Sequence, residues 1–337
     1  MGLTALLNAT KIVSADHLYR ILRACESAGI FSVEQDGDSV VVHNTPDSEL
    51  LCRDAPGSLA PLVLHASYES ALALNHLDDI ITSTDPTKET AWDFYSPNAN
   101  FWEWLDQEDQ RETLETFNTL MVNITMKELP FICGGFDWKA FLARIGGASP
   151  TSTCSIVDVG GGKGHLLRAL LDVASFRPVV FDTANMIDDA KAFWKADPPA
   201  DAEVEVEFVI GDFFDGSTIP AANCYVLKHI LHDWSDDKSV AILKAIREQA
   251  NTVVDSRVML VELVLDETKP LGPFESWVDI QMLNVVGGKE RSRRQWERDV
   301  LSKAGFKLEA VHVTGGTEAI IECSVRSCGV PPDTVRL

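Results

Sequence analysis

The sequence lacks the features of a membrane protein, a secreted protein or a disulfide-linked domain. No unbroken apolar run approaches the length of about 20 residues that a membrane-spanning helix needs. The first residues lack the basic and then apolar order of a secretory signal peptide. The 7 cysteines are scattered without a C-x-x-C pair, which favours reduced thiols over metal ligands or disulfides. We therefore expect a cytoplasmic protein with no membrane partner and no metal.

Positive charge is also scarce. Lys and Arg number 29 against 51 Asp and Glu, and the formal net charge is −22. Because such a surface repels phosphate groups, nucleic acid is not an expected partner. Apolar residues are plentiful: 45% of the 337 residues are hydrophobic, enough for two domains with cores of their own.

The N-terminal region begins with a predicted core-facing helix over residues 15–28. Helical spacing places Leu18, Ile21, Leu22 and Cys25 on one face of that helix.

A predicted hairpin follows the helix. Two short strands, 30–34 and 39–43, flank an Asp-Gly turn whose glycine tolerates a positive φ. Helix and hairpin together outline a winged helix. Since the wing carries Glu34, Asp36 and Asp38 where a DNA reader needs Lys or Arg, packing or self-association is the expected role.

Residues 60–145 are mostly helical by pattern and rich in aromatic side chains. Most of these side chains are expected in the core, but two or three could wall a pocket for a flat substrate. The candidate pocket residues are Met121 in this stretch and Trp277 and Met282 on a helix predicted over 274–286. We place the domain boundary between a winged-helix-like domain, 1–110, and a second domain, 111–337.

From residue 155 onward, short apolar runs alternate with helical patterns, which is typical of a doubly wound, mostly parallel sheet. The predicted strands are 155–159, 178–182, 205–210, 223–227, 257–264, 307–313 and 318–325. The last two are joined by a connection short enough for an antiparallel hairpin. The predicted fold class is α/β, with a mostly helical winged-helix-like domain before this sheet.

A glycine-rich turn follows the first of these strands. A P-loop needs Ser or Thr after its lysine, but Lys163 is followed by Gly164, and a dinucleotide fingerprint would need glycine where His165 stands. What remains is glycine at 160, 162 and 164, the spacing seen in S-adenosylmethionine-dependent methyltransferases. A purely structural turn is the alternative.

Ligands of open α/β sheets bind beyond the carboxyl ends of the strands, which draws attention to two aspartates. Asp182 ends the second strand, where a carboxylate can accept hydrogen bonds from ribose hydroxyls; a helix cap is the alternative. Asp212 follows the third strand and can accept from an adenine amino group while Phe213 lies against the ring. A structural turn is the alternative there.

The fourth strand leads into a loop that carries His232. Ser235 and the acidic residues after it predict a helix N-terminus, which leaves His232 at the mouth of the sheet. His229 is interpreted as a core or pocket-wall histidine.

Six motifs in this order resemble the caffeate- and flavonoid-type small-molecule O-methyltransferases of plants and fungi. The resemblance covers nearly the whole chain, weakly in 1–110 and strongly in 115–325. The motifs are Val157-Asp158-Val159-Gly160-Gly161-Gly162-Lys163-Gly164, Phe181-Asp182, Gly211-Asp212-Phe213-Phe214, Leu227-Lys228 with His232-Asp233-Trp234-Ser235-Asp236, Val261-Glu262 and Gly287-Gly288-Lys289-Glu290-Arg291.

The resemblance implies a Rossmann-like methyltransferase domain and assigns roles to particular residues. His232 would be the general base, with Glu262 and Glu290 holding and polarising its ring. The residues expected to contact S-adenosylmethionine, whose product is S-adenosylhomocysteine, are Gly160, Gly162, Asp182, Asp212, Phe213 and Lys228. Histidine suits the role because its pKa of about 6.5 lets it take a proton near neutral pH.

The resemblance also implies the activity, which is methyl transfer to a hydroxyl of an aromatic or polyketide-like small molecule. One alternative is an enzyme of the same fold that binds the cofactor but catalyses a non-methylating, for example pericyclic, reaction. Another is a catalytically silent winged-helix binding protein. Family members begin with extra helices that help build a dimer, whereas this winged-helix pattern starts almost at residue 1, so a homodimer is possible but not implied.

Overall fold

The computed structural model describes residues 2–10, 12–37, 39–55, 57–146 and 154–326, and these residues form two compact units. Unit 1 contains residues up to Tyr68 together with Arg111–Ile124, and unit 2 contains Glu69–Gln110 and everything from Thr125 onward. The helix α9 (Arg111–Gly134) contributes residues to both units. None of the described helices is both long and apolar enough to cross a membrane.

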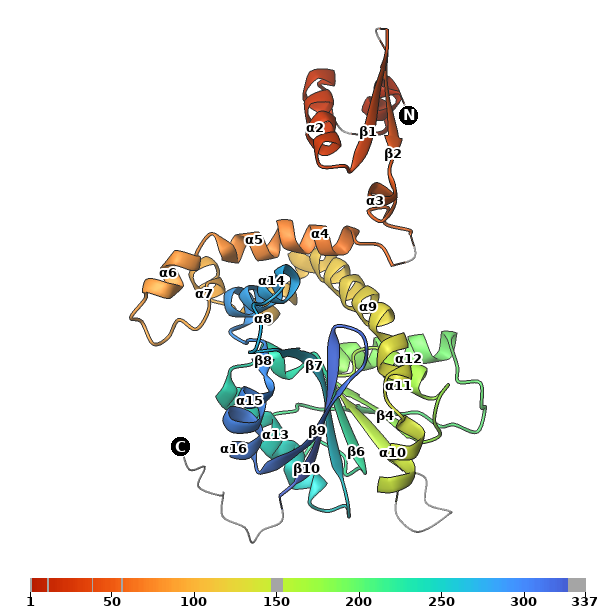
Figure 1. Ribbon diagram of the computed structural model, residues 1–337, viewed down its shortest axis with the longest axis vertical. Coiled ribbons are helices and arrows are strands. Elements are labelled where there is room, and N and C mark those ends of the chain that lie inside the picture. Colours follow the sequence, from red (N-terminus) through yellow and green to blue (C-terminus); the bar gives the residue numbers. More distant parts are fainter. Residues whose placement is uncertain (1, 11, 38, 56, 147–153, 327–337) are drawn as a thin grey trace. The chain divides into compact units, whose positions relative to one another are not determined.

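Unit 1 contains the expected helix and hairpin (Figure 1). Its strands β1 (Phe31–Asp36) and β2 (Ser39–Asn44) pair antiparallel, with Val33 opposite Val42. The predicted Asp38 of the wing lies outside the described residues. The helices of this unit before α9 are α1 (Leu3–Ala9), α2 (Ala15–Ser27), α3 (Pro46–Glu49) and α4 (Ala60–Ser67).

The core face of α2 is narrower than its spacing predicts. Leu18 and Leu22 are buried against Val42, whereas Ile21 is 55% exposed and Cys25 is only partly covered. The prediction that Ile21 is buried was wrong because the core of unit 1 is small. The elements packed against α2 cover only about one residue in each of its turns.

Unit 2 begins with short helices that bury much of the aromatic content predicted for this stretch. Trp92, Phe101 and Trp104 are packed edge to face and are almost fully buried. The helices of this part are α5 (Glu69–Leu74), α6 (Leu77–Thr82), α7 (Trp92–Tyr95), α8 (Phe101–Leu105), the short 3₁₀ turn η1 (Glu108–Gln110) and, after α9, α10 (Trp138–Ile145).

The centre of unit 2 is a sheet in the order β5-β4-β3-β6-β7-β10-β9. The first five strands in this order are parallel, and β10 and β9 complete an antiparallel edge, as the fold-class prediction requires. The strands are β3 (Ser155–Val159), β4 (Arg177–Asp182), β5 (Glu207–Ile210), β6 (Cys224–Lys228), β7 (Arg257–Leu265), β9 (Phe306–Val313) and β10 (Glu318–Val325). A two-residue strand, β8 (Arg291–Ser292), pairs with β7 and has no counterpart among the predicted strands.

Helices cover both faces of this sheet (Figure 1). One core contains apolar residues of α9 and α10 with those of α11 (His165–Leu170) and α12 (Ala184–Ala196). The other contains α13 (Asp236–Ala250) and the segment η4 (Trp296–Leu301) to α16 (Ser302–Ala304), which follows α15 (Arg293–Gln295). Strands buried on both faces explain why β3, β4 and β6 are apolar without alternation.

The connection from β7 to β8 contains α14 (Pro273–Gln281) and a π-helical turn, η3 (Met282–Val286). Gly287 ends this turn with a φ of 77°, a left-handed conformation that favours glycine. The sequence predicts one helix over 274–286, whereas the structure changes from α-helical to π-helical geometry at Met282.

The predicted boundary after residue 110 falls at the start of α9, whereas compactness assigns 69–110 to the sheet-containing unit. A functional division at residue 110 stays a prediction.

Candidate functional site

The glycine loop leaves β3 at the carboxyl edge of the sheet. Gly160, Gly162 and Gly164 have φ values of 69°, 57° and 81°, which L-residues with side chains rarely adopt. A Cβ at Gly160 would approach Ile230 Cδ1 to 2.5 Å, and one at Gly164 would approach Trp194 Nε1 to 2.6 Å. At Gly162, by contrast, only Met186 Cε lies near, at 3.7 Å. The loop is therefore tightly seated at both ends and open at Gly162.

Asp182 lies beside this loop, at the end of β4, and Asp212 lies just beyond the end of β5. Asp182 accepts hydrogen bonds from the backbone N–H of Gly162, at 2.8 Å, and of Thr183, at 2.7 Å. Burial raises the pKa of Asp182, and these two bonds oppose the rise. Asp212 is exposed and accepts from the Phe214 N–H at 2.9 Å. Asp182 ends β4 and Asp212 follows β5, as the predicted strands require, while their contacts to a cofactor stay predictions.

Phe213 lies close to the glycine loop. Its Cε1 would be 3.9 Å from a Cβ at Gly160, and its ring meets Trp234 edge to face at 6.0 Å. The structure therefore brings together the glycine loop, Asp182 and an aromatic ring, which are parts that suit a nucleoside.

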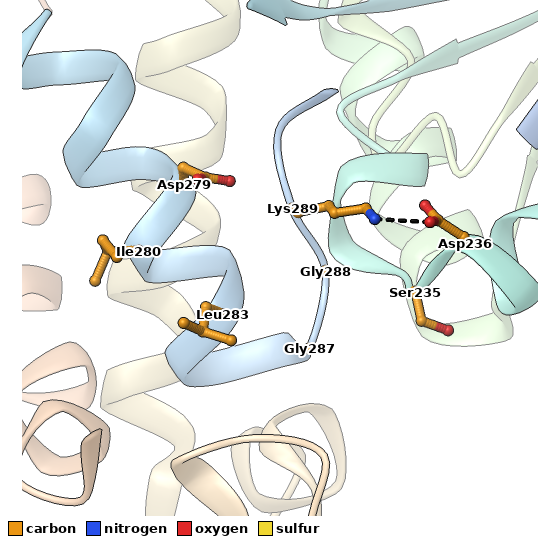
Figure 2. Close-up of a pocket in the computed structure, with 8 residues that line it drawn as sticks. All are labelled: Ser235, Asp236, Asp279, Ile280, Leu283, Gly287, Gly288 and Lys289. Atoms are coloured by element: carbon orange, nitrogen blue, oxygen red, sulfur yellow. Dashed lines mark hydrogen bonds and ion pairs between the residues drawn. The ribbon is translucent and has the colours of Figure 1, made fainter. Parts of the chain in front are cut away.

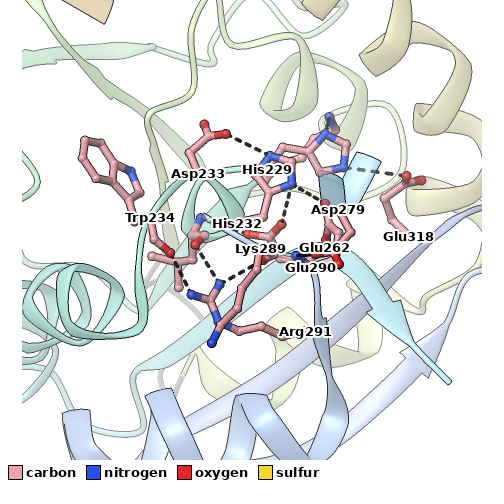
Figure 3. Close-up of polar contacts among 12 residues, drawn as sticks. His229, His232, Asp233, Trp234, Glu262, Asp279, Lys289, Glu290, Arg291 and Glu318 are labelled. Atoms are coloured by element: carbon pink, nitrogen blue, oxygen red, sulfur yellow. Dashed lines mark hydrogen bonds and ion pairs between the residues drawn. The ribbon is translucent and has the colours of Figure 1, made fainter. Parts of the chain in front are cut away.

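His232 lies on the 3₁₀ turn η2 (Leu231–Asp233), which directly follows β6, the strand next to β3 in the sheet. Its Nδ1 donates to Glu290 Oε1 at 2.8 Å and lies 3.9 Å from Glu262 Oε2 (Figure 3). Its Nε2 lies 3.5 Å from Asp233 Oδ1. The structure thus brings together the three residues predicted for catalysis.

The two glutamates are buried and reach the ring from different elements. Glu262, on β7, has no exposed surface, and its Oε1 accepts from the Leu231 N–H at 3.0 Å. Glu290, in the loop before β8, is 2% exposed, and its N–H donates to Asp279 Oδ1. Burial raises the pKa of Glu262 to about 7, against the opposing effect of His232.

The acidic surroundings make the imidazole of His232 a strong proton acceptor. Burial lowers its pKa, but the carboxylates of Asp233, Glu262 and Glu290 outweigh this and raise it to about 10. Burial also raises the pKa of Asp233, to about 6. Because Nδ1 is held by Glu290, Nε2 is the atom that can exchange a proton with a ligand.

Arg291 joins the loop of Glu290 to the loop of His232. Its fully buried guanidinium donates to Leu231 O at 2.9 Å, Trp234 O at 2.7 Å and Asp236 Oδ1 at 2.8 Å (Figure 3). Lys289 adds a bond from its N–H to His232 O. This clamp holds the base and its carboxylate at a fixed separation.

Gly288 lets these two loops approach each other. A Cβ there would lie 1.8 Å from His232 O, so any side chain would push the loops apart. The conformation of this loop thus depends on the glycine pair that the sequence motif contains.

Lys228, predicted to contact the cofactor, has partners within the protein. Its Nζ lies 2.7 Å from Glu128 Oε2 and donates to Thr125 Oγ1 at 3.2 Å. The structure therefore places Lys228 in a second buried cluster with Glu128, His229 and Glu318, while its role with the cofactor stays a prediction.

Two groups of described residues bring three ligand-type atoms within 4.8 Å of one another: Glu128 with His229 and Glu318, and His232 with Glu262 and Glu290. The ammonium of Lys228 already pairs with Glu128 of the first group, and the imidazole of His232 is the cation of the second. We assign neither group to a metal, and a reaction without metal stays a prediction.

A pocket of about 420 Å³ lies beside the Glu290 loop (Figure 2). It lies between the α14–η3 helix and the start of α13, and Lys289 crosses it to reach Asp236 at 2.6 Å. The lining residues are Ser235, Asp236, Asp279, Ile280, Leu283, Gly287, Gly288 and Lys289.

None of the predicted substrate residues lines this pocket. Trp277, on α14, is 37% exposed, and Met282 begins η3 and is half-buried. Met121 belongs to unit 1, so the structure does not place it with the other two. All three stay predictions.

Sequence reasoning missed several residues of the site. Asp233 and Arg291 lie within the six motifs given above. The charge that each places next to His232 or Glu290 in the sequence could have identified them as site residues. Glu128 and Glu318 gave no signal, because α9 and β10 bring them to His229 only in the folded chain. Asp158, buried at the end of β3 with its pKa raised to about 7 by burial, was also missed.

Comparisons with known proteins show which family the chain resembles. A family model described as an O-methyltransferase domain matches residues 148–307. The mitomycin biosynthesis 6-O-methyltransferase of Streptomyces lavendulae is 29% identical over 308 residues, covering 91% of this chain and 79% of that protein.

Solved structures show the same likeness. The mitomycin 7-O-methyltransferase MmcR has a TM-score of 0.79 at 27% identity, covering 96% of this chain and 87% of that one. NcsB1, an O-methyltransferase from neocarzinostatin biosynthesis solved with S-adenosylmethionine and 2-hydroxy-5-methyl naphthoic acid, has a TM-score of 0.73 at 28% identity, covering 93% and 86%. The matched domain over 148–307 and the likeness over nine-tenths of the chain support the O-methyltransferase family as the one that this chain resembles.

Proposed function

We propose that the protein transfers a methyl group from S-adenosylmethionine to a hydroxyl of an aromatic or polyketide-like small molecule. The observation that carries the proposal is the bond of 2.8 Å between His232 Nδ1 and buried Glu290, one strand away from the glycine loop. The similarity to methyltransferases of mitomycin and neocarzinostatin biosynthesis supports the acceptor class.

The residues at the strand ends fit the cofactor. Gly162 leaves open space beside the backbone, Asp182 offers a carboxylate at the end of β4, and Phe213 offers an aromatic face near Gly160. In the proposal these residues and Asp212 hold the nucleoside, and Lys228 lies near the same strand edge. When bound, S-adenosylmethionine supplies an electrophilic methyl group and a positive charge.

In the proposed mechanism His232 takes the proton of the acceptor hydroxyl on Nε2. A phenol becomes a strong nucleophile only as it loses its proton, and a positioned base contributes about 10²–10⁴-fold. Glu290 keeps the Nδ1 proton in place and, with Glu262 and Asp233, stabilises the imidazolium that forms. A positive charge near the ring lowers its pKa, which favours the neutral imidazole that the reaction needs.

The alternatives are less well supported. The relatives named above are methyltransferases, which does not favour a non-methylating enzyme. The full set of base and carboxylates is also more than a silent binding protein requires. The expected cytoplasmic location and self-association stay predictions.

The test is an assay of S-adenosylhomocysteine release with matched acceptors. Each aromatic scaffold of a panel of phenols and hydroxylated polyketides is offered with a free hydroxyl, with an amino group in its place, and with the hydroxyl already methylated. Release confined to free hydroxyls, with a mass gain of one methylene on the product, supports the proposal. Release confined to the amines would instead assign an N-methyltransferase, and tight cofactor binding without turnover of any scaffold would count against this acceptor class.

A further inference from the structure

A second buried acid–base cluster lies against the base, and the proposed reaction does not use it. It consists of Glu128 from α9, Lys228 and His229 at the end of β6, and Glu318 at the start of β10, and we call it the His229 cluster. Glu128 and Glu318 are 7% and 5% exposed. Four charged or titratable side chains from three elements therefore meet in the interior of unit 2.

The backbone of His229 is strained. Its φ is 53°, and Asp255 is the one other residue besides glycine with a positive φ in the described part of the chain. Holding a residue in this region costs on the order of 1 kcal/mol or more and requires surrounding contacts that maintain it. The imidazole that this backbone carries lies between the carboxylates of the cluster and the ring of His232.

The neighbours of His229 determine its tautomer. Lys228 Nζ lies 3.2 Å from Nδ1, and because an ammonium can only donate, Nδ1 is the acceptor. The proton is then on Nε2, which lies 3.8 Å from Glu128 Oε1 and 3.7 Å from Glu318 Oε1. Burial and the charge of Lys228 lower the pKa of His229 to about 3, so the ring is neutral.

The neutral ring of His229 lies on the ring of His232. Their centroids are 5.1 Å apart and their planes differ by 24°, which is a stacked arrangement. Among the described contacts the ring of His232 makes one hydrogen bond, at Nδ1, while Nε2 lies 3.5 Å from Asp233 Oδ1, and a ring held by one hydrogen bond can still rotate about it. A flat neighbour against one face restricts that rotation, and a neutral π-face does not repel the imidazolium as a second cation would.

We propose that His229 is a positioning residue for the base: its ring, fixed by Lys228 and Glu318, holds the ring of His232 in the orientation that presents Nε2 to the acceptor. This inference rests on the proposed function. Stacked rings share no hydrogen bond, so His229 orients His232 and does not relay its proton. The charged groups that face the pair are Lys228, Glu128 and Glu318 on one side and Asp233, Glu262 and Glu290 on the other.

The test compares His229→Phe, which keeps a flat ring, with His229→Ala, which removes it. His43→Ala, on the hairpin of unit 1, is the matched control. The readouts are kcat, both KM values, the pH profile and the affinity for S-adenosylhomocysteine. We expect His229→Ala to lower kcat about 10-fold with both KM values within about two-fold, and His229→Phe to restore kcat to within about three-fold of the parent protein.

Two outcomes would overturn the proposal. If His229→Ala kept the parent kcat, the stack would have no part in turnover. If His229→Phe folded normally and were as slow as His229→Ala, the polar contacts of His229 and not its ring would matter.

A measurement without turnover separates this proposal from the proposed function. In protein labelled with ¹⁵N-histidine, the resonances of the His232 ring should be sharp in the parent protein and should broaden in His229→Ala. They should stay sharp in His229→Phe, which keeps a ring at this position, and in Glu318→Gln, which keeps both the ring and a polar side chain beside it. Unchanged line widths in His229→Ala would refute the positioning role, whereas failure of the parent protein to methylate any free hydroxyl of the acceptor panel would refute the proposed function and leave the ring-orientation result intact.

Discussion

Replacing Glu290 by Gln should separate the two effects of this residue on His232. Gln keeps the size of the side chain and an oxygen that can accept from Nδ1, but it removes a buried negative charge 2.8 Å from the ring. An opposite charge this close moves a pKa by about one to three pH units. The pKa of His232 is raised to about 10 by Asp233, Glu262 and Glu290 together, so the substitution should lower it by an amount in that range.

The expected signature is a shifted pH–rate profile. Since the base must be neutral to act, kcat/KM should rise with pH toward the pKa of the free enzyme. In Glu290→Gln this rise should begin about one to three pH units lower, because less negative charge surrounds the ring. The plateau at high pH should fall about 10- to 100-fold, because an amide holds the tautomer and stabilises the imidazolium less well than a carboxylate.

The same substitution has a consequence for stability. The folded-state pKa of His232 lies above the ordinary value of about 6.5, so its ion pair stabilises the fold fully below that pH and is lost as pH rises through about 10. Urea unfolding should therefore show a larger loss in Glu290→Gln at pH 6 than at pH 10. Glu297→Gln, at an exposed position, is the matched control. A rising limb that stays at the parent pH would show that Glu290 does not set the protonation of His232.

Three further substitutions test other parts of the site. His232→Ala should lower kcat by about 10²-fold or more with nearly unchanged cofactor affinity, and single-turnover rates equal to the parent would remove His232 from the mechanism. Asp182→Ala should weaken S-adenosylmethionine binding at least about 10-fold in a calorimetric titration, because both the hydrogen bond to Gly162 and the expected ribose contact are lost. An affinity equal to that of the parent protein would contradict the role of Asp182 in binding the nucleoside. Arg291→Met should lower the free energy of unfolding by about 3–5 kcal/mol in urea, because Asp236 and two carbonyl oxygens lose a buried partner. A loss below about 1 kcal/mol would show that the fold does not need the contacts of Arg291.

Much of the fold can be read from local pattern. The strands predicted over 155–159 and 223–227 match β3 (Ser155–Val159) and β6 (Cys224–Lys228) to within a residue, because a strand covered on both faces is an apolar run of fixed length. The glycine loop could also be predicted, since its three glycines at alternate positions are needed where φ is positive. Topology then follows from alternation, as a parallel strand requires a crossover helix.

Local pattern failed where neighbours come from distant parts of the chain. The helical spacing of α2 predicts that Ile21 is buried, but the side chain is exposed in the structure. Its burial depends on which elements pack against the helix, and these are known only from the folded chain. The change from α14 to the π-helical turn η3 is likewise absent from the sequence pattern, which predicts one continuous helix.

The sequence by itself determined the class of sheet, the glycine loop and the aspartates at the strand ends, since each of these depends on residue type and local spacing. The histidine and its two glutamates came from the resemblance to O-methyltransferases, and their roles stay predictions. The tertiary structure alone decided that Glu290 and not Glu262 hydrogen-bonds the ring, that Arg291 clamps the two loops, and that Lys228 and His229 share a buried cluster with Glu128 and Glu318. The physical reason is that charge interactions depend on distance and burial, and both are set by elements that lie far apart in the chain and meet only in the folded protein.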